Sequence, residues 1–435
     1  MILQSKGYCV NDTRQTNLLF IVKDNTIIFN PEYNEPINLD LIIHYKKIIF
    51  SDYKLNNCLF DRYETDDFNN LEYIQSDFNC SVDNLPMQIT HLTFGSKFNR
   101  FVDNLSKYLI HLTFGYEFNN LVDNLPNTLT HLTFGSHFNR EVNNLPNSLT
   151  HLTFGWNFNQ LVDNLPKYLT HLTFCWDFNQ LVNNLPNSLT HLTFGYDFNQ
   201  SADNLPNILT HLTFGHYFNQ HVDNLHDTLT HLTFGYHFNQ EVNNLPKYLT
   251  HLTFGYKFNQ SVDNLPNLLT YLTFNCEFNQ YVDNLPDSLT HLTFGYEFNK
   301  QVDNLPNSLT HLTFDNNSFD KRINLQFNIK YLKLNCNNQY LIDNLSDNIE
   351  ELEFGYDFDL EINNLPSSIK KIIFYQYSKY NKELNCLPNF IELIQLPQYY
   401  DKKILKISKE LKKVICFRNY KFIKDFDNLN VETYI

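Results

Sequence analysis

The feature that most constrains this chain is a repeat of 20 residues. From residue 87 to residue 314, the sequence returns at this interval to the pattern N-L-P-x-x-L-T-H-L-T-F-G-x-x-F-N-Q-x-V-D. Twelve segments carry its H-L-T-F centre, with Tyr271 replacing the histidine once. Self-similarity at a fixed period of this size is typical of a solenoid, in which each unit buries an apolar face by stacking on its neighbours. The repeat therefore predicts the fold class.

A degenerate form of the repeat continues toward both ends of the chain. Residues 329–334, 349–354, 369–374, 391–396 and 411–416 keep apolar side chains at relative positions 1, 4 and 6, and residues 71–79 fit in part. This gives about 18 turns of 20 residues. We predict three segments: an amino-terminal β cap or small domain at residues 1–67, a regular array at 68–315, and degenerate repeats with a carboxyl-terminal cap at 316–435. Residues 18–22, 26–29 and 47–50 are the strands expected in the cap.

Each turn is predicted to hold one short strand. In residues 149–154, alternate side chains point to opposite faces, so Leu152 and Phe154 face the core while His151 and Thr153 face outward. Pro166 blocks a helix through the return segment, and the chain contains a single alanine, Ala202. The fold class is therefore mainly β, a leucine-rich-repeat-like solenoid with a parallel sheet on one face and an extended or turn-like back face. The predicted core of a turn is Leu149, Leu152, Phe154, Phe158, Val162 and Leu165.

Ten of the eleven glycines directly follow the predicted strand. Because Gly, Asn and Asp tolerate positive φ best, and Asn275 and Asp315 replace glycine here, we expect a left-handed or tight-turn conformation at this position. The alternative is that close packing requires a small residue, which Cys175 also satisfies. The recurring Asn159 and Asn164 are expected to bridge the backbones of adjacent turns.

The segment L-P-x-S-L-T-H-L-T-F-G-x-x-F-N, seen at residues 145–159 and 185–199, resembles the FNIP repeat family. That family looks like a leucine-rich-repeat variant, although its repeats are usually slightly longer. The resemblance implies a solenoid that acts in protein interactions. FNIP proteins occur mostly in amoebae and giant viruses, and some carry an amino-terminal F-box that would recruit a ubiquitin ligase. Residues 1–67 show no Leu-Pro followed by helical apolar spacing, so a β cap is the preferred interpretation.

Composition limits the compartment and the classes of partner that we expect for this chain. The chain has 47 acidic against 32 basic residues, a net charge of −15, which argues against nucleic acid as a partner. We expect no membrane segment, because no apolar run approaches about 18 residues. The eight cysteines form no C-x-x-C pair, so neither a disulfide framework nor a zinc site is indicated. We expect a monomeric protein of the cytoplasm, or of the host cytoplasm if the chain is viral, without a cofactor or metal.

The histidines of the repeat form a column. Stacking in register would place nine imidazoles, from His91 to His251, in a row on the exposed face of the sheet. Such a column could bind a divalent metal or respond to pH near 6. The favoured interpretation is that each histidine is copied with its repeat and that the neutral rings stack and bond to threonine neighbours. Coupled titration should still make the surface sensitive to acid.

We expect no enzymatic activity. A catalytic group needs a singular, tuned environment, whereas nearly every His, Asp and Thr here belongs to a repeated column. The sequence contains no nucleophile elbow, P-loop or glycine-rich nucleotide fingerprint.

Variation between repeats indicates where a partner would bind. The residue after the repeat glycine is mostly aromatic, and a variable, often charged residue follows it. Exposed aromatic side chains with acidic neighbours are typical anchors for a protein partner. The alternative is that these rings stack on one another and seal the edge of the sheet. The predicted partner-binding residues are Trp156, Trp176, Tyr196, Tyr236, Tyr256, Tyr296, His151, His171 and His191.

The sequence thus favours a non-enzymatic protein–protein interaction scaffold that binds an unidentified partner through its concave face and its aromatic stripe. One alternative is the substrate-recognition arm of a ubiquitin ligase adaptor, which would need residues 1–67 to dock a ligase subunit. A second is a structural protein that assembles through its own ends or edges.

Overall fold

The computed structural model describes residues 19–54, 71–323, 325, 328–426 and 428–434. It is a mainly-β, leucine-rich-repeat-like parallel solenoid of about 19 turns spaced about 20 residues apart, which confirms the predicted fold class. The chain divides into two compact units, Met1–Phe218 and Asn219–Ile435. Among the described residues, no helix is long and apolar enough to cross a membrane.

The first unit begins with the strands expected in the amino-terminal segment. Strand β1 (Phe20–Lys23) pairs antiparallel with β2 (Thr26–Phe29), and β2 pairs parallel with β3 (Lys47–Phe50). A short helix, α1 (Leu39–Ile42), lies between β2 and β3. Strand β3 pairs directly with the first repeat strand, so the sheet runs without a break into the array. The repeat strands are β4 (His91–Thr93), β5 (His111–Thr113), β6 (His131–Thr133), β7 (His151–Thr153), β8 (His171–Thr173), β9 (His191–Thr193) and β10 (His211–Thr213).

The second unit is a stack of parallel strands of the same kind. Its repeat strands are β11 (His231–Thr233), β12 (His251–Thr253), β13 (Tyr271–Thr273), β14 (His291–Phe294) and β15 (His311–Phe314). The degenerate repeats supply β16 (Tyr331–Leu334), β17 (Glu351–Phe354), β18 (Lys371–Phe374), β19 (Leu393–Gln395), β20 (Lys413–Phe417) and β21 (Asn430–Tyr434). Helix α3 (Gln339–Asp343) follows β16, and a 3₁₀ turn (Ile423–Phe426) precedes β21.

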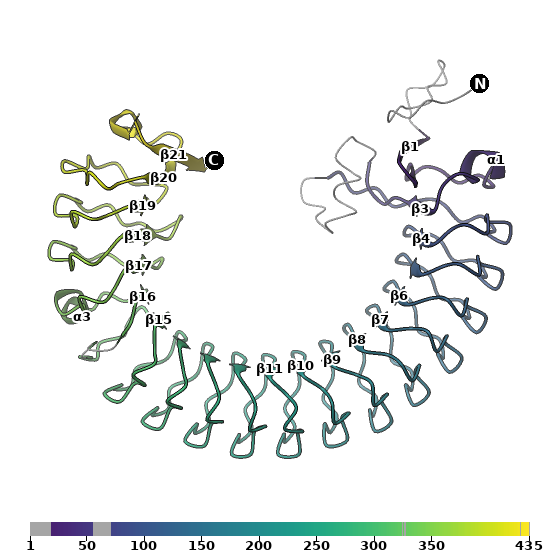
Figure 1. Cartoon of the computed structure of the whole chain (residues 1–435), viewed down its shortest axis with the longest axis horizontal. Helices are drawn as coiled ribbons and strands as arrows, with labels where there is room; N and C mark the ends of the chain where they lie inside the picture. Colours follow the sequence, from purple (N-terminus) through teal and green to yellow (C-terminus); the bar gives the residue numbers. More distant parts are fainter. Residues whose placement is uncertain (1–18, 55–70, 324, 326–327, 427, 435) are drawn as a thin grey trace. The chain divides into compact units, whose positions relative to one another are not determined.

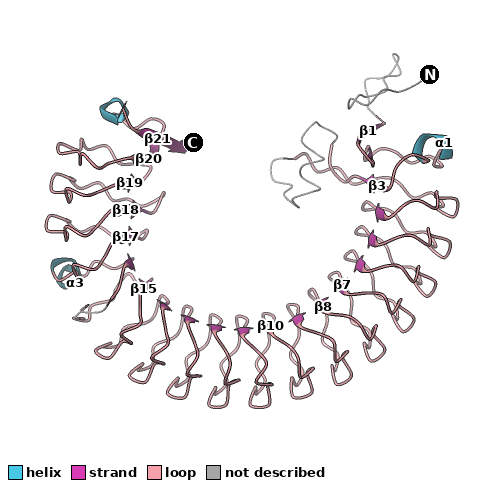
Figure 2. Ribbon diagram, viewed as in Figure 1, coloured by secondary structure: helices cyan, strands magenta, loops and turns pink. Residues whose placement is uncertain are grey.

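Within each unit the strands line the concave side, and turns and extended segments form the back (Figure 1). Almost all of the back is irregular, and helices α1 and α3 are single short turns within it (Figure 2). The pairing is in exact register, as in His151 opposite His171 and Thr153 opposite Thr173. A 20-residue period therefore places equivalent side chains of successive turns next to one another.

Phenylalanine columns form the centre of the solenoid. The rings of Phe154 and Phe158 stack within one turn at 3.7 Å between centroids, and Phe154 stacks on Phe174 of the next turn at 5.5 Å. Continuous stacking of this kind supplies both apolar burial and favourable ring contacts in every turn. All six predicted core residues of this turn are buried, which confirms the prediction: Leu149, Leu152, Phe154, Phe158, Val162 and Leu165.

Asparagines join adjacent turns, as predicted. The backbone N–H of Asn159 donates to the side-chain oxygen of Asn139 at 3.0 Å, and the amide of Asn164 donates to the side chain of Asn143 at 3.1 Å. Gln160 also donates to Asn139, at 2.9 Å. Each bond satisfies a polar group in a turn that lacks a β ladder.

The left-handed conformation predicted for the repeat glycines is wrong, whereas the tight-turn alternative agrees with the bond from the N–H of Phe98 to the carbonyl oxygen of Gly95 at 3.3 Å. None of the described glycines has a positive φ. A Cβ added to Gly155 would instead lie far inside van der Waals distance of the carbonyl oxygen of Gly135 in the preceding turn. The repeat keeps glycine because the backbones of adjacent turns approach closely here, which is the packing alternative.

Candidate interaction surface

The aromatic residues after the repeat glycine form a stacked row, which we call the aromatic stripe. Trp156 stacks on Trp176 at 5.3 Å between centroids, Trp176 on Tyr196 at 4.7 Å, and Tyr196 on His216 at 4.2 Å. Backbone bonds set this spacing, because the N–H of Asp177 donates to the carbonyl oxygen of Trp156 at 2.8 Å and the next turn repeats the bond. The stripe lies beyond the carboxyl ends of β7 to β10.

Stacking leaves the stripe accessible. Trp156 and Trp176 are each 49% exposed. In the second unit Tyr236 stacks on Tyr256 at 4.5 Å, while Tyr296 is exposed and has no ring partner among the described residues. The rings therefore stack on one another, as the packing interpretation predicts, and remain partly exposed.

Acidic side chains accompany the stripe of the first unit. Asp177 and Asp197 follow Trp176 and Tyr196, and no ion pair joins either carboxylate within the described part of the chain. In the second unit, by contrast, Lys257 pairs with Glu277 at 2.5 Å between the lysine nitrogen and a carboxylate oxygen. The first unit thus combines exposed rings with uncompensated negative charge.

The histidine column lies at the amino ends of the strands. Rings of His151, His171 and His191 stack at 4.2 Å between centroids, and all three are half-buried. Nδ1 of His151 lies 2.9 Å from the hydroxyl oxygen of Thr150, and His171 makes the same contact with Thr170. This is the arrangement of stacked rings and threonine partners that the sequence favoured.

Burial lowers the pKa of His151 and His171. Desolvation lowers the pKa of His151, and the neighbouring His131 and His191 add to the effect because two imidazolium charges would repel. His171 shows the same direction for the same reasons, with His151 and His191 as the neighbours. Above pH about 6.5 these two rings are therefore neutral and available for hydrogen bonds.

The geometry does not favour a metal site in this column. Parallel rings about one repeat apart point their outer nitrogens in the same direction, whereas a tetrahedral ion needs lone pairs that converge. The described residues contain no group of three or more His, Cys, Asp and Glu side chains that could hold a metal ion. The six described cysteines are not joined in disulfides.

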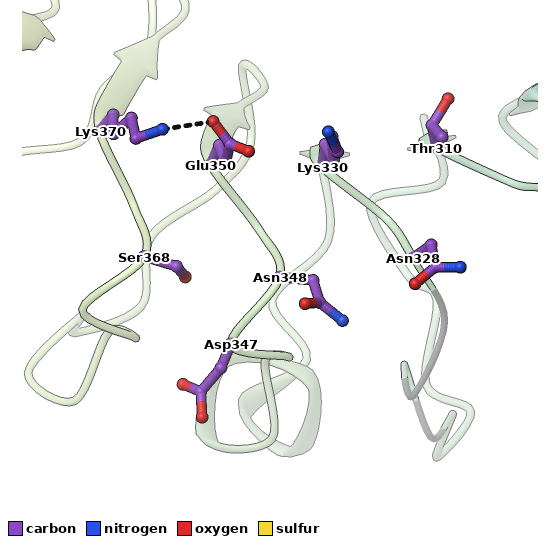
Figure 3. Close-up of a pocket in the computed structure, with 8 residues that line it drawn as sticks. All are labelled: Thr310, Asn328, Lys330, Asp347, Asn348, Glu350, Ser368 and Lys370. Carbon is purple, nitrogen blue, oxygen red and sulfur yellow. Dashed lines mark hydrogen bonds and ion pairs between the residues drawn. The ribbon is translucent and has the colours of Figure 1, made fainter.

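A polar hollow of about 520 Å³ lies along β15 to β18 (Figure 3). The carboxylate of Glu350 and the amino group of Lys370 form an ion pair at 2.6 Å across it, with Lys330 on the adjacent turn. The Ser368 hydroxyl donates to the carbonyl oxygen of Ile349 at 2.7 Å and is not paired with a base. The hollow therefore presents a charge-balanced surface and no nucleophile–base arrangement.

A second polar hollow, of about 490 Å³, adjoins the stripe in the first unit. Ring contact links it to the stripe, because the imidazole of His137 lies 4.4 Å from the ring of Tyr116 between centroids. Sequence reasoning did not select this group as a site, although Glu117, His137 and Asn157 each stand one residue after a stripe position. The residues that line the hollow are Asn99, Glu117, Asn119, His137 and Asn157.

The repeat of this chain matches a known family model. The FNIP Repeat model matches overlapping stretches that together cover residues 100–317, and also residues 337–376. The chain belongs to the FNIP repeat family. Among solved structures, that of CroV588, described as a novel circular LRR protein structure, is 35% identical with a TM-score of 0.62. The match covers 92% of this FNIP chain and 77% of that chain.

Two further structures are more distant from this FNIP repeat protein. YopM from Yersinia enterocolitica WA-314 is 17% identical, with a TM-score of 0.41, over 82% of this chain and 92% of that one. The pneumococcal vaccine antigen PcpA is 15% identical, with a TM-score of 0.24, over 99% and 98%. No curated protein sequence matches the chain significantly. Leucine-rich-repeat-like solenoids are typical of protein-binding scaffolds and are generally non-catalytic.

Proposed function

We propose that this FNIP repeat protein is a non-enzymatic scaffold that binds a protein partner through the aromatic stripe and the adjoining concave sheet. The observation that carries the proposal is the stack of Trp156, Trp176 and Tyr196, which leaves half of each tryptophan exposed. Exposed tryptophans held rigidly by neighbours lose little conformational entropy when a partner covers them, and tryptophan is enriched among residues that dominate binding energy.

The concave sheet extends this surface. His151, His171 and His191 form a strip of stacked, half-buried rings at the other end of the same strands. A polar strip whose hydrogen bonds a partner can satisfy suits the polar, solvent-accessible rim of a protein interface. Binding across both strips would engage several turns at once.

A comparison of two double variants tests the proposal. Changing Trp156 and Trp176 to alanine should reduce capture of the partner at least tenfold in a quantitative pull-down with the full chain. The matched control is Tyr168→Ala with Tyr248→Ala, since these tyrosines are similarly exposed but lie outside the stripe. Equal loss of capture in both variants would contradict the proposal, as would unchanged capture by the tryptophan variant. Circular dichroism melting should show both variants folded.

A further inference from the structure

The aromatic stripe of the first unit is interrupted at Ser136. Trp156 stacks on Trp176 but has no ring contact toward Ser136 within the described residues. Tyr116, two turns before Trp156, is 40% exposed, and the ring of His137 lies against it at 4.4 Å between centroids. The turn between them therefore contributes a serine at the stripe position and leaves one face of Trp156 without a ring contact among the described side chains, and we call this place the Ser136 gap.

The Ser136 gap can take one planar group on the open face of Trp156. Neighbouring parallel strands lie about 4.8 Å apart, so the stripe positions of Tyr116 and Trp156 are separated by about 9.6 Å, and the imidazole of His137 takes up the Tyr116 side. One ring or guanidinium at the stripe position of Ser136 would lie at a normal stacking distance from Trp156. Trp176 demonstrates such a fit at its own turn, since it lies between Trp156 and Tyr196 at 5.3 and 4.7 Å.

The wall of the Ser136 gap is polar and acidic. The hollow of about 490 Å³ spans the same three turns through Glu117, His137 and Asn157. Lys97 stands one turn before Glu117 at the same position of the repeat. Its amino group pairs with Asp77, one turn further from the gap, at 2.5 Å. Arg140 donates to the carbonyl oxygen of Asn119 at 2.9 Å and does not line the hollow. The carboxylate of Glu117 is in no ion pair within the described residues.

We propose that the Ser136 gap receives an arginine side chain from an extended, basic segment of the protein partner. This inference rests on the proposed function and names the partner's chemistry. A guanidinium is planar, so it can stack on the open face of Trp156, and it keeps donors at its edge for Glu117 and the side-chain oxygen of Asn157. A lysine ammonium offers charge without the planar face. An acidic segment would be repelled by the carboxylate of Glu117, and a neutral aromatic would gain no charge interaction with it.

The rest of the segment lies along the stripe toward His216. Asp177 and Asp197 flank this path, and within the described residues neither is in an ion pair. Basic side chains that follow the arginine meet these carboxylates, so binding is strongest at low ionic strength. The stripe of the second unit lacks this complementarity where Lys257 already pairs with Glu277.

The probe is a fluorescein-labelled ten-residue peptide of alternating glycine and arginine, titrated into the full chain and followed by anisotropy. Two control peptides replace each arginine by lysine or by neutral, planar citrulline. The arginine peptide should bind at least fivefold more tightly than the lysine peptide and more tightly still than the citrulline peptide. Equal affinity for arginine and lysine would overturn the inference, because it would indicate attraction by net charge alone.

The decisive variant is Ser136→Trp. Tryptophan is the native residue at the equivalent position of the next turn, so the variant should fold, and it should fill the gap and weaken the arginine peptide at least tenfold. Glu117→Gln should weaken it about threefold, whereas Glu297→Gln, the same column position in the second unit, should not. Unchanged binding by Ser136→Trp contradicts the inference. If the peptide fails to bind while the tryptophan double variant still loses the partner, the gap inference fails and the proposed function stands.

Discussion

The outward face of the sheet carries different chemistry in two stretches of the chain. Strands β4 to β10 of the first unit present histidine and threonine, with rings stacked at 4.1 to 4.4 Å. In the second unit, lysine and glutamate alternate at the positions just before β16 to β20, and ion pairs also join some strand positions, such as Lys371 with Glu351 at 2.7 Å. We call these the histidine column and the charge ladder. The inward face is alike in both, because Phe154 and Phe374 are both fully buried.

The difference shows two solutions to one constraint. Register places equivalent positions of a parallel sheet about 4.8 Å apart, so a charged residue copied in every turn would face its own charge. The histidine column repeats a side chain that stacks when neutral, whereas the charge ladder alternates sign. Tyr331 stands at the boundary in the second unit: its ring stacks on His311 at 5.5 Å and its hydroxyl donates to Glu353 at 2.6 Å.

The largest effect is expected where the backbones of adjacent turns approach closely, in the stretch that carries the histidine column. Gly155→Val should lower the free energy of unfolding by about 3 kcal/mol, because the new side chain collides with the backbone of Gly135 and cannot move aside. Urea unfolding followed by circular dichroism measures this. Tyr375 occupies the equivalent position in the charge ladder and is 45% exposed, so Tyr375→Val should cost less than about 1 kcal/mol. Equal costs would show that both stretches pack their turns alike.

The second-largest effect is expected from lowering the pH, which should destabilise the histidine column before the charge ladder. Desolvation lowers the pKa of five histidines in the first unit, and like neighbours and Lys47 reinforce it. The unfolded chain therefore binds protons more readily, so stability is full above pH about 6.5 and falls as the pH drops through 6.5 toward 5. We expect the melting temperature to fall by about 5 °C between pH 7.5 and 5. The histidines are His91, His111, His131, His151 and His171.

The charge ladder should respond only at lower pH. Lysine partners lower the pKa of Glu350 and Glu392 through hydrogen bonds and charge, so their contribution is present above about pH 4.5 and is lost below it. Chemical shifts of histidine and glutamate side chains against pH would follow the two transitions separately. A flat stability profile between pH 7 and 5 would contradict the acid sensitivity of the histidine column.

The repeat was sufficient to predict the core, the register and the columns, because a period of 20 residues in a parallel stack leaves no freedom for Leu152 or Phe154. The prediction of left-handed glycines failed for a physical reason. Gly155 and a glycine at positive φ look the same in a sequence, and only the distance between adjacent backbones separates them. The hollow in the same turns as Ser136 was missed because some of its lining residues occupy a position that differs from repeat to repeat, and a search for recurring residues passes over such positions.

A single substitution in the histidine column should have a smaller effect. His151→Ala removes ring contacts with His131 and His171, both at 4.2 Å, and should cost about 1 kcal/mol at pH 7.5. His151→Tyr should cost less than about 0.5 kcal/mol, since Tyr271 stacks between His251 and His291 at 4.3 and 4.0 Å. Thermal unfolding of both variants measures the difference. If tyrosine costs as much as alanine, the threonine bond and not stacking stabilises the column.

The smallest effect is expected from one rung of the charge ladder. Lys371 and Glu351 form an isolated pair in their column, because the flanking strand positions are Tyr331 and Leu393. Lys371→Glu should cost about 0.5 kcal/mol at low salt, as exposed pairs contribute little. Adding Glu351→Lys reverses the pair and should restore stability, and 1 M salt should remove most of the difference by screening. A double-mutant cycle from urea unfolding gives the coupling energy. If the reversed pair does not restore stability, the charge ladder depends on where each lysine side chain lies over the sheet. Alternation of sign alone would then not explain the second stretch.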